Sequence, residues 1–407
     1  MIYIFLLSYI ICTYLTYRIV RATLPFFYLL FFGVMYIGTT YGLNIDYESD
    51  VYYFFLIITF LFCYTIATVL FNIKFPISKA FKVYKSKPFI YDSNSTIRLF
   101  WFLLIISSIL TVFYFYLVGS NIFIMIMNDS SQADITTARV NSYSGETYFA
   151  PGYFNQFKNV LFPVSICILL FNNVKNKKII KFFFIPLAFL GLAGTGQRAF
   201  LMYTFLGIVI SFFYIGKLKF KSLIIPSALM ILSFGVGSFY LGRTQDLSFF
   251  ATFDNLLTRI FYNEQSESLI TFRYLYEIPI SYGYDWYRGI IGILPGVKGS
   301  EIQHIVFGLI HGNPRGTAAL SFIGSIYHNF GFVGVVIVSF IFGFLVNKLT
   351  FNFLKRKKEI GIVVFFSFIT FYISIYSSGD VVFLFNKGVV LLMLLTVLIY
   401  NNRVWKR

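Results

Sequence analysis

Long apolar runs alternate along this chain with short polar connections. Eleven of the runs have about the length that an α-helix needs to cross a hydrocarbon core of about 30 Å. The predicted spans cover residues 2–17, 24–43, 51–73, 99–119, 154–172, 180–196, 199–216, 222–241, 331–350, 360–377 and 381–400. The pattern therefore predicts an all-α polytopic membrane protein, with about eleven transmembrane helices in a single integral membrane domain over 1–407.

Two connections are far longer than the others, at 120–153 and at 242–330. A structureless connection as long as the second would be unusual, and its apolar residues recur at helical spacing. Short amphipathic helices are predicted there on three sets of residues: Leu256, Leu257, Ile260 and Phe261; Leu269, Phe272, Leu275 and Tyr276; and Ile302, Ile305, Val306, Leu309 and Ile310. We expect these helices to rest on the bilayer surface or to dip into a cavity.

Basic residues, mostly Lys, fill the connections at one end of alternate spans. Examples are the connections at 74–98, 173–179, 217–221 and 351–359. By the positive-inside rule this face is the cytoplasm of a bacterial inner membrane, with the N-terminus periplasmic and the C-terminus cytoplasmic. The two long connections then become periplasmic loops.

Composition agrees with a membrane chain and narrows its partners. Hydrophobic residues make up 58% and charged residues 12%, against roughly 45–50% and 25% in soluble domains. The net charge of +17 is scattered between spans, so membrane lipid and not nucleic acid is the expected partner. The first apolar run lacks a basic region and a cleavage site, which is typical of a retained span. The three cysteines all lie inside predicted spans, so no disulfide framework or metal site is predicted, and no nucleotide-binding motif is present.

Arginine marks the predicted outer face. The residues concerned are Arg139, Arg198, Arg243, Arg259, Arg273, Arg288 and Arg315. Topology does not require Arg there, whereas a planar guanidinium binds phosphate with two parallel hydrogen bonds. Arg259 and Arg273 lie beside acids on amphipathic segments and are predicted to be structural. The other five are candidate ligands of an anionic group, although an arginine at a span end also serves as an interfacial anchor.

The polar clusters of the long loops supply the candidate chemistry. Arg198 ends a tight Gly194-Thr195-Gly196-Gln197 turn, and the aromatic and glycine-rich stretch 286–299 suits either a sugar face or an interfacial anchor. His311 and His328 are candidate general bases, because a neutral imidazole removes a proton from a hydroxyl near neutral pH. The alternative for each is a hydrogen-bonded interfacial histidine. Glu301 and Asp380 are further candidate bases, and Lys387 lies inside the last predicted span.

The organisation and two local motifs resemble the O-antigen polymerases, the Wzy-type polymerases of oligosaccharide repeat units. The motifs are the hairpin Gly194-Thr195-Gly196-Gln197-Arg198 and the run Ser321 to Gly334, which contains Tyr327-His328-Asn329-Phe330-Gly331. Members of that family carry an Arg followed by ten residues and a Gly in each of two external loops. Arg288 and Gly299 fit this spacing, whereas Arg139 meets Ala150 at the corresponding position.

The resemblance implies a GT-C-like helical bundle with one large periplasmic loop. It implies a glycosyltransferase, independent of metal and nucleotide, that transfers a growing glycan from undecaprenyl pyrophosphate to the next lipid-linked repeat unit. The implied partners are the lipid-linked oligosaccharides and a chain-length regulator protein. Two alternatives stay open: an O-antigen ligase, and a flippase or other transporter of lipid-linked oligosaccharides.

Overall fold

The computed structural model describes residues 1–144, 151–195, 199–216, 249–294, 297–313, 316–375, 379–386 and 388–400. Helices account for 81% of the structure. In those ranges extended pairing is limited to one isolated bridge between Ile90 and Glu359. The all-α prediction is therefore confirmed.

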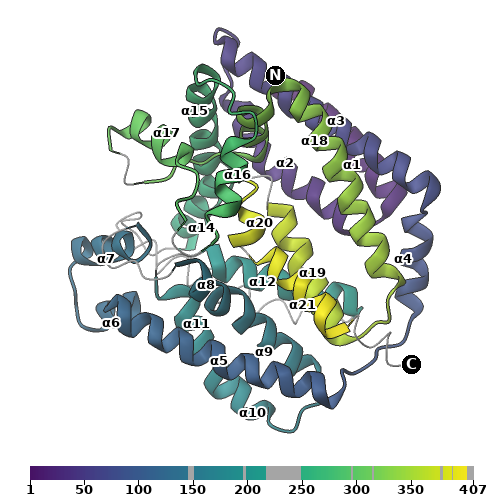
Figure 1. The fold of residues 1–407 in the computed structure, drawn as a ribbon, viewed down its shortest axis with the longest axis vertical. Coiled ribbons are helices and arrows are strands. Elements are labelled where there is room, and N and C mark those ends of the chain that lie inside the picture. Colours follow the sequence, from purple (N-terminus) through teal and green to yellow (C-terminus); the bar gives the residue numbers. More distant parts are fainter. Residues whose placement is uncertain are drawn as a thin grey trace. The chain divides into compact units, whose positions relative to one another are not determined.

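The longest helices are α3, α5 and α18, with 27, 25 and 34 residues (Figure 1). The bounds of the described helices are α1 Ile2–Val20, α2 Leu24–Gly42, α3 Glu48–Lys74, α4 Ile77–Ser86, α5 Asn94–Val118, α6 Ile122–Met127, α7 Gln132–Ser144, α8 Pro151–Gln156, η1 Phe157–Leu161, α9 Phe162–Phe171, α10 Lys177–Ile179, η2 Ile180–Phe184, α11 Ile185–Ala193, α12 Ala199–Ile215, α14 Phe249–Thr258, η3 Arg259–Asn263, α15 Glu264–Glu277, α16 Tyr284–Ile291, α17 Ile302–His311, α18 Phe322–Lys355, α19 Ile360–Ser374, α20 Phe383–Asn386 and α21 Val389–Tyr400, where η denotes a π-helical turn.

In the part of the chain that the structure describes, six helices are long and apolar enough to cross a membrane: Ile2–Val20, Leu24–Gly42, Glu48–Lys74, Asn94–Val118, Tyr153–Phe171 and Phe322–Lys355. Shorter apolar helices cover Phe200–Ile215, Ile360–Ser374 and Val389–Tyr400, which coincide with three further predicted spans. The predicted span 222–241 lies outside the described residues. The structure thus supports a membrane-embedded helical protein, and the number eleven stays a prediction.

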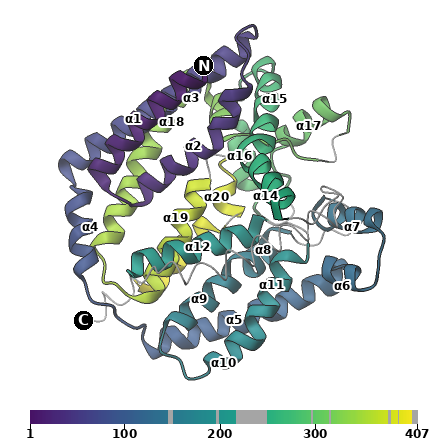
Figure 2. The same cartoon turned by 180° about the vertical axis from the view of Figure 1, so that it is seen from behind.

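The chain forms two compact units, which we describe separately. Unit 1 comprises Met1–Lys87, Leu257–Lys357 and Thr370–Phe385, and unit 2 comprises Pro88–Leu256, Lys358–Ile369 and Asn386–Arg407. In unit 1, α1, α2 and α3 pack together and α18 lies along α3, as both views of the ribbon show (Figures 1 and 2).

Helices α3 and α18 run parallel, because contacts advance along both in the same direction. The Tyr53 hydroxyl lies 2.6 Å from Ser321 Oγ near one end, and the Asn347 side-chain amide donates to Thr68 Oγ1 near the other. At Gly343 a Cβ would lie 3.0 Å from the carbonyl oxygen of Tyr64, so the two backbones approach closely. Parallel packing agrees with the alternating topology, in which both helices cross from the outer to the inner face.

The segments predicted to be amphipathic are helical, and they differ in how far protein covers their apolar residues. Leu257 and Phe261 are each 38% exposed, and Ile305 and Leu309 of α17 are 51% and 54% exposed. In α15, Leu269, Phe272 and Leu275 are buried, and the Phe272 ring stacks on Tyr53 of α3 at 4.1 Å between centroids. Helix α17 packs its buried face on α15. The apolar stripe of α15 therefore forms part of the core of unit 1.

Unit 2 contains two π-helical turns, and each precedes a proline. Turn η1 ends at Leu161 before Pro163, and η2 ends at Phe184 before Pro186. Proline has no N–H to donate to the carbonyl four residues earlier, and a π-turn shifts the hydrogen-bond pattern around that gap. The two turns fall on the predicted spans at 154–172 and 180–196, which therefore carry built-in irregularities.

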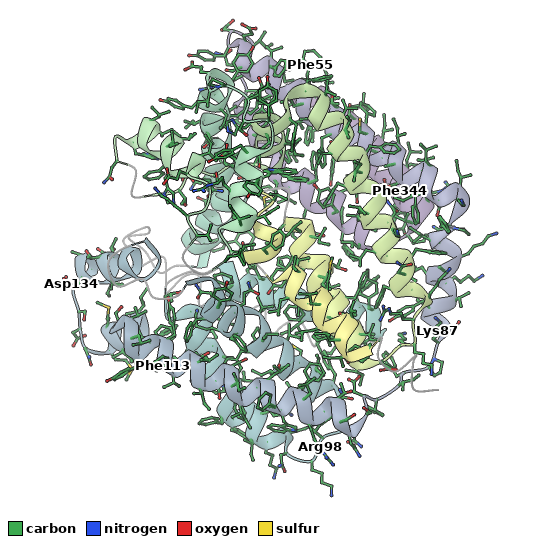
Figure 3. The ribbon with its side chains drawn as sticks, in the orientation of Figure 1. Phe55, Lys87, Arg98, Phe113, Asp134 and Phe344 are labelled. Carbon is green, nitrogen blue, oxygen red and sulfur yellow. The ribbon has the colours of Figure 1, made fainter. Side chains whose placement is uncertain are left out.

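Large apolar side chains cover the outside of the long helices. Phe55 and Phe344 of unit 1 are 57% and 39% exposed, and Phe113 of unit 2 is 44% exposed (Figure 3). Exposed aromatic side chains on helices of this length fit a lipid environment, because there they contact lipid and are not exposed to water.

Replacing Gly343 by Leu should destabilise unit 1 by about 1–3 kcal/mol, because the new side chain would overpack the α3–α18 contact. Thermal unfolding of the purified protein in detergent measures the effect. Val333→Leu is the matched control, because Val333 lies on the same helix and is 65% exposed. Equal unfolding temperatures for the two variants would contradict the close packing.

Candidate functional site

The site is built around a break in α18. This helix covers Phe322–Lys355 and is interrupted at Gly331, the residue at which the predicted span 331–350 begins. The residues from Phe322 to Phe330, which belong to the predicted long loop, form a helical segment directly before that span. At Gly331 the backbone leaves the helical region, with φ 65° and ψ −163°, a conformation that favours glycine. The first part of α18 therefore ends at the residues that the sequence had marked as polar.

The break presents backbone carbonyls to the segment before α16. In an unbroken helix the carbonyls of His328 and Asn329 would accept from N–H groups four residues later. Here they accept from the N–H groups of Ser281 and Gly283, at 2.8 and 2.9 Å. Tyr282 and Gly283 both have positive φ, 51° and 86°, which turns the chain sharply into α16. Two distant parts of the chain are thereby fixed together.

This docking sets Asp285 against His328. Asp285 lies in the first turn of α16, where the helix dipole favours a carboxylate. Its Oδ2 lies 2.9 Å from His328 Nε2, and the two side chains are 17% and 3% exposed. A carboxylate only accepts, so Nε2 carries the proton, and Nδ1 of the neutral ring is the basic nitrogen. Nδ1 is buried and has no hydrogen-bond partner among the described residues.

Ser300 completes the environment of Asp285. Its hydroxyl donates to Asp285 Oδ1 at 2.6 Å. The chain reaches Ser300 because Gly292 and Gly299 touch: a Cβ on Gly292 would lie 2.5 Å from Gly299 Cα. The spacing from Arg288 to Gly299 thus has a physical counterpart, a tight closure of the loop after α16.

A second series of side-chain hydrogen bonds lies in the same region as the one from Ser300 through Asp285 to His328. The Asn329 Oδ1 accepts from Ser281 Oγ and from the backbone N–H of Trp286. The Trp286 indole donates to Ser325 Oγ at 2.8 Å, and Ser325 Oγ donates to Asp380 Oδ1 at 2.6 Å. Asp380 is 4% exposed. Every side chain in this series of hydrogen bonds has a partner, as buried polar networks require.

The two carboxyl groups of the site differ in their electrostatics. The hydrogen bond from His328 lowers the pKa of Asp285, and the bond from Ser300 adds to this effect. Burial raises the pKa of Asp380 more than the bond from Ser325 lowers it. Asp285 is therefore a stable anion that orients His328, whereas Asp380 takes up a proton more readily than an ordinary aspartic acid.

Only some of the predicted site residues belong to the His328 network. His328 joins the network, whereas His311 lies exposed at the end of α17 with its ring 4.3 Å from that of Phe307. Arg288 is half-buried on α16, one turn after Asp285, and its charge contributes to a lowered pKa of Glu301, whose main cause is Lys298. Arg273 forms a two-fold hydrogen bond with the buried Asp50, at 2.8 Å each, as expected for a structural arginine.

The remaining predicted cations are not placed by the structure. Arg198, Arg243, Arg315 and Lys387 lie outside the described residues. Arg139 belongs to α7, and its side chain is likewise outside the described part. Their roles stay predictions.

Sequence reasoning missed Asp285, Ser300 and Ser325. Asp285 directly precedes the stretch 286–299 that was singled out, and an acid beside a tryptophan and an arginine was the available signal. Its partner is 43 residues away in the chain, so the pair becomes visible only in the fold. Among the residues that the structure describes, no group of three His, Cys, Asp or Glu side chains is placed to hold a metal ion.

Comparisons of this chain with protein-family models, with curated proteins and with solved structures give no match.

Asp285→Asn should lower the unfolding temperature at pH 5–7. The depressed pKa of Asp285 means that the carboxylate stabilises the fold above the unfolded value of about 3.9, and that this stabilisation is lost as pH falls through the folded value. The deficit of the variant should therefore shrink below about pH 4. Thermal scans across this range, with exposed Asp46→Asn as control, measure the difference. A deficit that does not change with pH would contradict an ionised Asp285.

Proposed function

We propose that this protein is a membrane-embedded glycosyltransferase that joins lipid-linked oligosaccharide repeat units, the activity of the O-antigen polymerases that the chain resembles. One observation carries the proposal. His328 is buried, is oriented through Nε2 by an ionised Asp285, and presents Nδ1 without a protein partner. A buried acceptor without a partner costs about 1–3 kcal/mol, so a substrate hydroxyl that donates to it is favoured.

The reaction follows from these groups. Nδ1 of His328 takes the proton of the acceptor sugar hydroxyl as its oxygen attacks the anomeric carbon of the donor glycan. The bond from that carbon to the pyrophosphate oxygen breaks, and the lipid pyrophosphate leaves with the electron pair. Asp285 stabilises the imidazolium that forms, and general-base assistance of this kind contributes about 10²–10⁴ in rate.

The leaving pyrophosphate needs cations. Arg288, one turn beyond Asp285 on α16, is the candidate whose position is described. Arg139, Arg198, Arg243 and Arg315 are proposed as further pyrophosphate ligands. Charge stabilisation by such groups acts on the transition state, in which negative charge grows on the leaving oxygen.

The proposed location is the periplasmic face of a bacterial inner membrane, with an external N-terminus and a cytoplasmic C-terminus. Basic connections on alternate sides support this orientation. The proposed partners are undecaprenyl-pyrophosphate-linked oligosaccharides and a chain-length regulator. Transfer of the finished glycan to a core lipid, the ligase reaction, would use the same base and leaving group with a different acceptor.

A transporter of lipid-linked oligosaccharides is a second candidate. The observations in its favour are a broken helix at Gly331 and a buried Lys158 in the candidate span Tyr153–Phe171. Transporters place their ligand sites at such breaks. We favour the transferase because Nδ1 of His328 has no protein partner among the described residues, and a transfer reaction needs such a nitrogen to take the proton of the acceptor hydroxyl.

His328→Gln should abolish polymer formation while the protein is still made. Glutamine retains a donor for Asp285 but lacks a base, so we expect at least about a hundredfold loss of rate. In a strain lacking the chromosomal gene, the surface polysaccharide on a gel should be core plus a single repeat unit. Bare core would instead indicate a ligase or a transporter.

His311→Gln is the matched control and should leave long chains intact, because His311 lies outside the network. Arg288→Lys preserves the charge but loses the planar fork, and should shorten or thin the chains. Full-length polymer from His328→Gln would overturn the proposed base.

A further inference from the structure

Unit 2 holds a buried lysine that the proposed reaction does not use. Lys158 lies in the π-turn η1, inside the candidate span Tyr153–Phe171, and is 1% exposed. Single π-turns in α-helices occur frequently at functional sites. A lysine about two turns from a helix end ordinarily extends its chain toward water. This one is turned inward, so interfacial anchoring does not explain it.

The surroundings of the Lys158 ammonium are neutral. Its Nζ donates to Asn159 Oδ1 at 2.7 Å and to the carbonyl oxygen of Gly191 at 3.1 Å. The rings of Tyr114 and Phe115 lie 5.2 and 5.9 Å away, within the range of cation–π attraction. Within the described ranges no carboxylate pairs with Nζ, since the ion pairs there involve other residues. A buried charge is ordinarily paired, because its desolvation is costly.

The same cluster has donors to spare. An ammonium carries three N–H bonds, of which two are directed at the acceptors just named. Asn159 Nδ2 is buried and, within the described part of the chain, without a hydrogen-bond partner. Asn159 is the neighbour of Lys158 in the π-turn. The cluster therefore has positive charge and unused donors, and it lacks a negatively charged acceptor.

We propose that Lys158 and Asn159 form a buried oxyanion-binding subsite in unit 2. Its ligand is an anionic oxygen group, supplied either by the phosphate of a polyprenyl lipid or by the carboxylate of an acidic sugar. The ligand accepts from the free N–H of Lys158 and from Asn159 Nδ2, and it neutralises the ammonium. The subsite does not depend on the transfer reaction, because none of its residues belongs to the His328 network.

The test uses the purified full-length protein in an uncharged, phosphate-free detergent. Farnesyl pyrophosphate probes the lipid phosphate, glucuronic acid probes the sugar carboxylate, and farnesol is the uncharged control. Thermal unfolding should show that one of the two anions raises the melting temperature and that farnesol does not. The anion that acts identifies the source of the ligand.

Two variants assign the effect to this cluster. Lys158→Met removes the charge, and Asn159→Asp supplies a built-in carboxylate beside Lys158. Each variant should lower the affinity of the protein for the stabilising anion by about tenfold or more, since hydrogen bonds to a charged group are worth roughly 1.5–3 kcal/mol. Asn159→Asp should in addition raise the melting temperature without any ligand. Lys348→Met, at an exposed lysine of α18, is the control and should bind as the parent does.

Asn159→Asp also keeps the proposal falsifiable if Lys158→Met does not fold. The proposal is overturned if neither anion stabilises the parent protein, or if Asn159→Asp binds the stabilising anion as tightly as the parent. Such a result would not change the conclusion drawn from the His328 experiment. In the same way, loss of polymer in His328→Gln would neither support nor contradict the proposed subsite.

Discussion

The backbone hydrogen bonds at the Gly331 break hold the candidate site together. A helix that crosses lipid has to satisfy its own N–H and C=O groups, so a break survives only where other protein groups take them over. Ser281 and Gly283 do this for the carbonyls of His328 and Asn329. The same two bonds fix where α16 begins, and therefore where Asp285 stands. The carboxylate therefore lies beside His328 because the N–H groups of Ser281 and Gly283 donate to the carbonyls that the broken helix leaves without partners.

Both units place polar side chains in apolar helices through local irregularity. In unit 1 a glycine with positive φ ends the helical segment that carries His328. In unit 2 a proline two residues after a π-turn accompanies the buried Lys158. An uninterrupted helix satisfies its backbone completely and offers a ligand only side chains. An interrupted helix re-aims side chains and exposes backbone groups, and for this reason interruptions and polar residues occur together here.

The sequence predicts the long helices well and the site only in part. The predicted span 24–43 corresponds to Leu24–Gly42, because lipid imposes a one-dimensional rule of length and apolarity. The predicted start of the span at 331 coincides with the break at Gly331, whereas the helical segment before it was not predicted. Ser325, His328 and Asn329 are polar, and their partners lie far away in the chain, so the sequence does not show that they are satisfied. Asp285 was missed because its partner is distant in the chain. Lys158 was overlooked since a lysine near a span end has an ordinary explanation in snorkelling.

The central claim is that Asp285 fixes the proton of His328 on Nε2 and leaves Nδ1 as the base. The chain has only three histidines, so ¹⁵N-histidine labelling with His304 and His311 replaced by Gln isolates one ring in an NMR spectrum. The ¹⁵N chemical shifts of the neutral ring distinguish a protonated nitrogen from an unprotonated one. We expect the Nε2–H tautomer in the parent protein and a mixture of tautomers in Asp285→Asn. A neutral ring protonated on Nδ1 in the parent would contradict this claim.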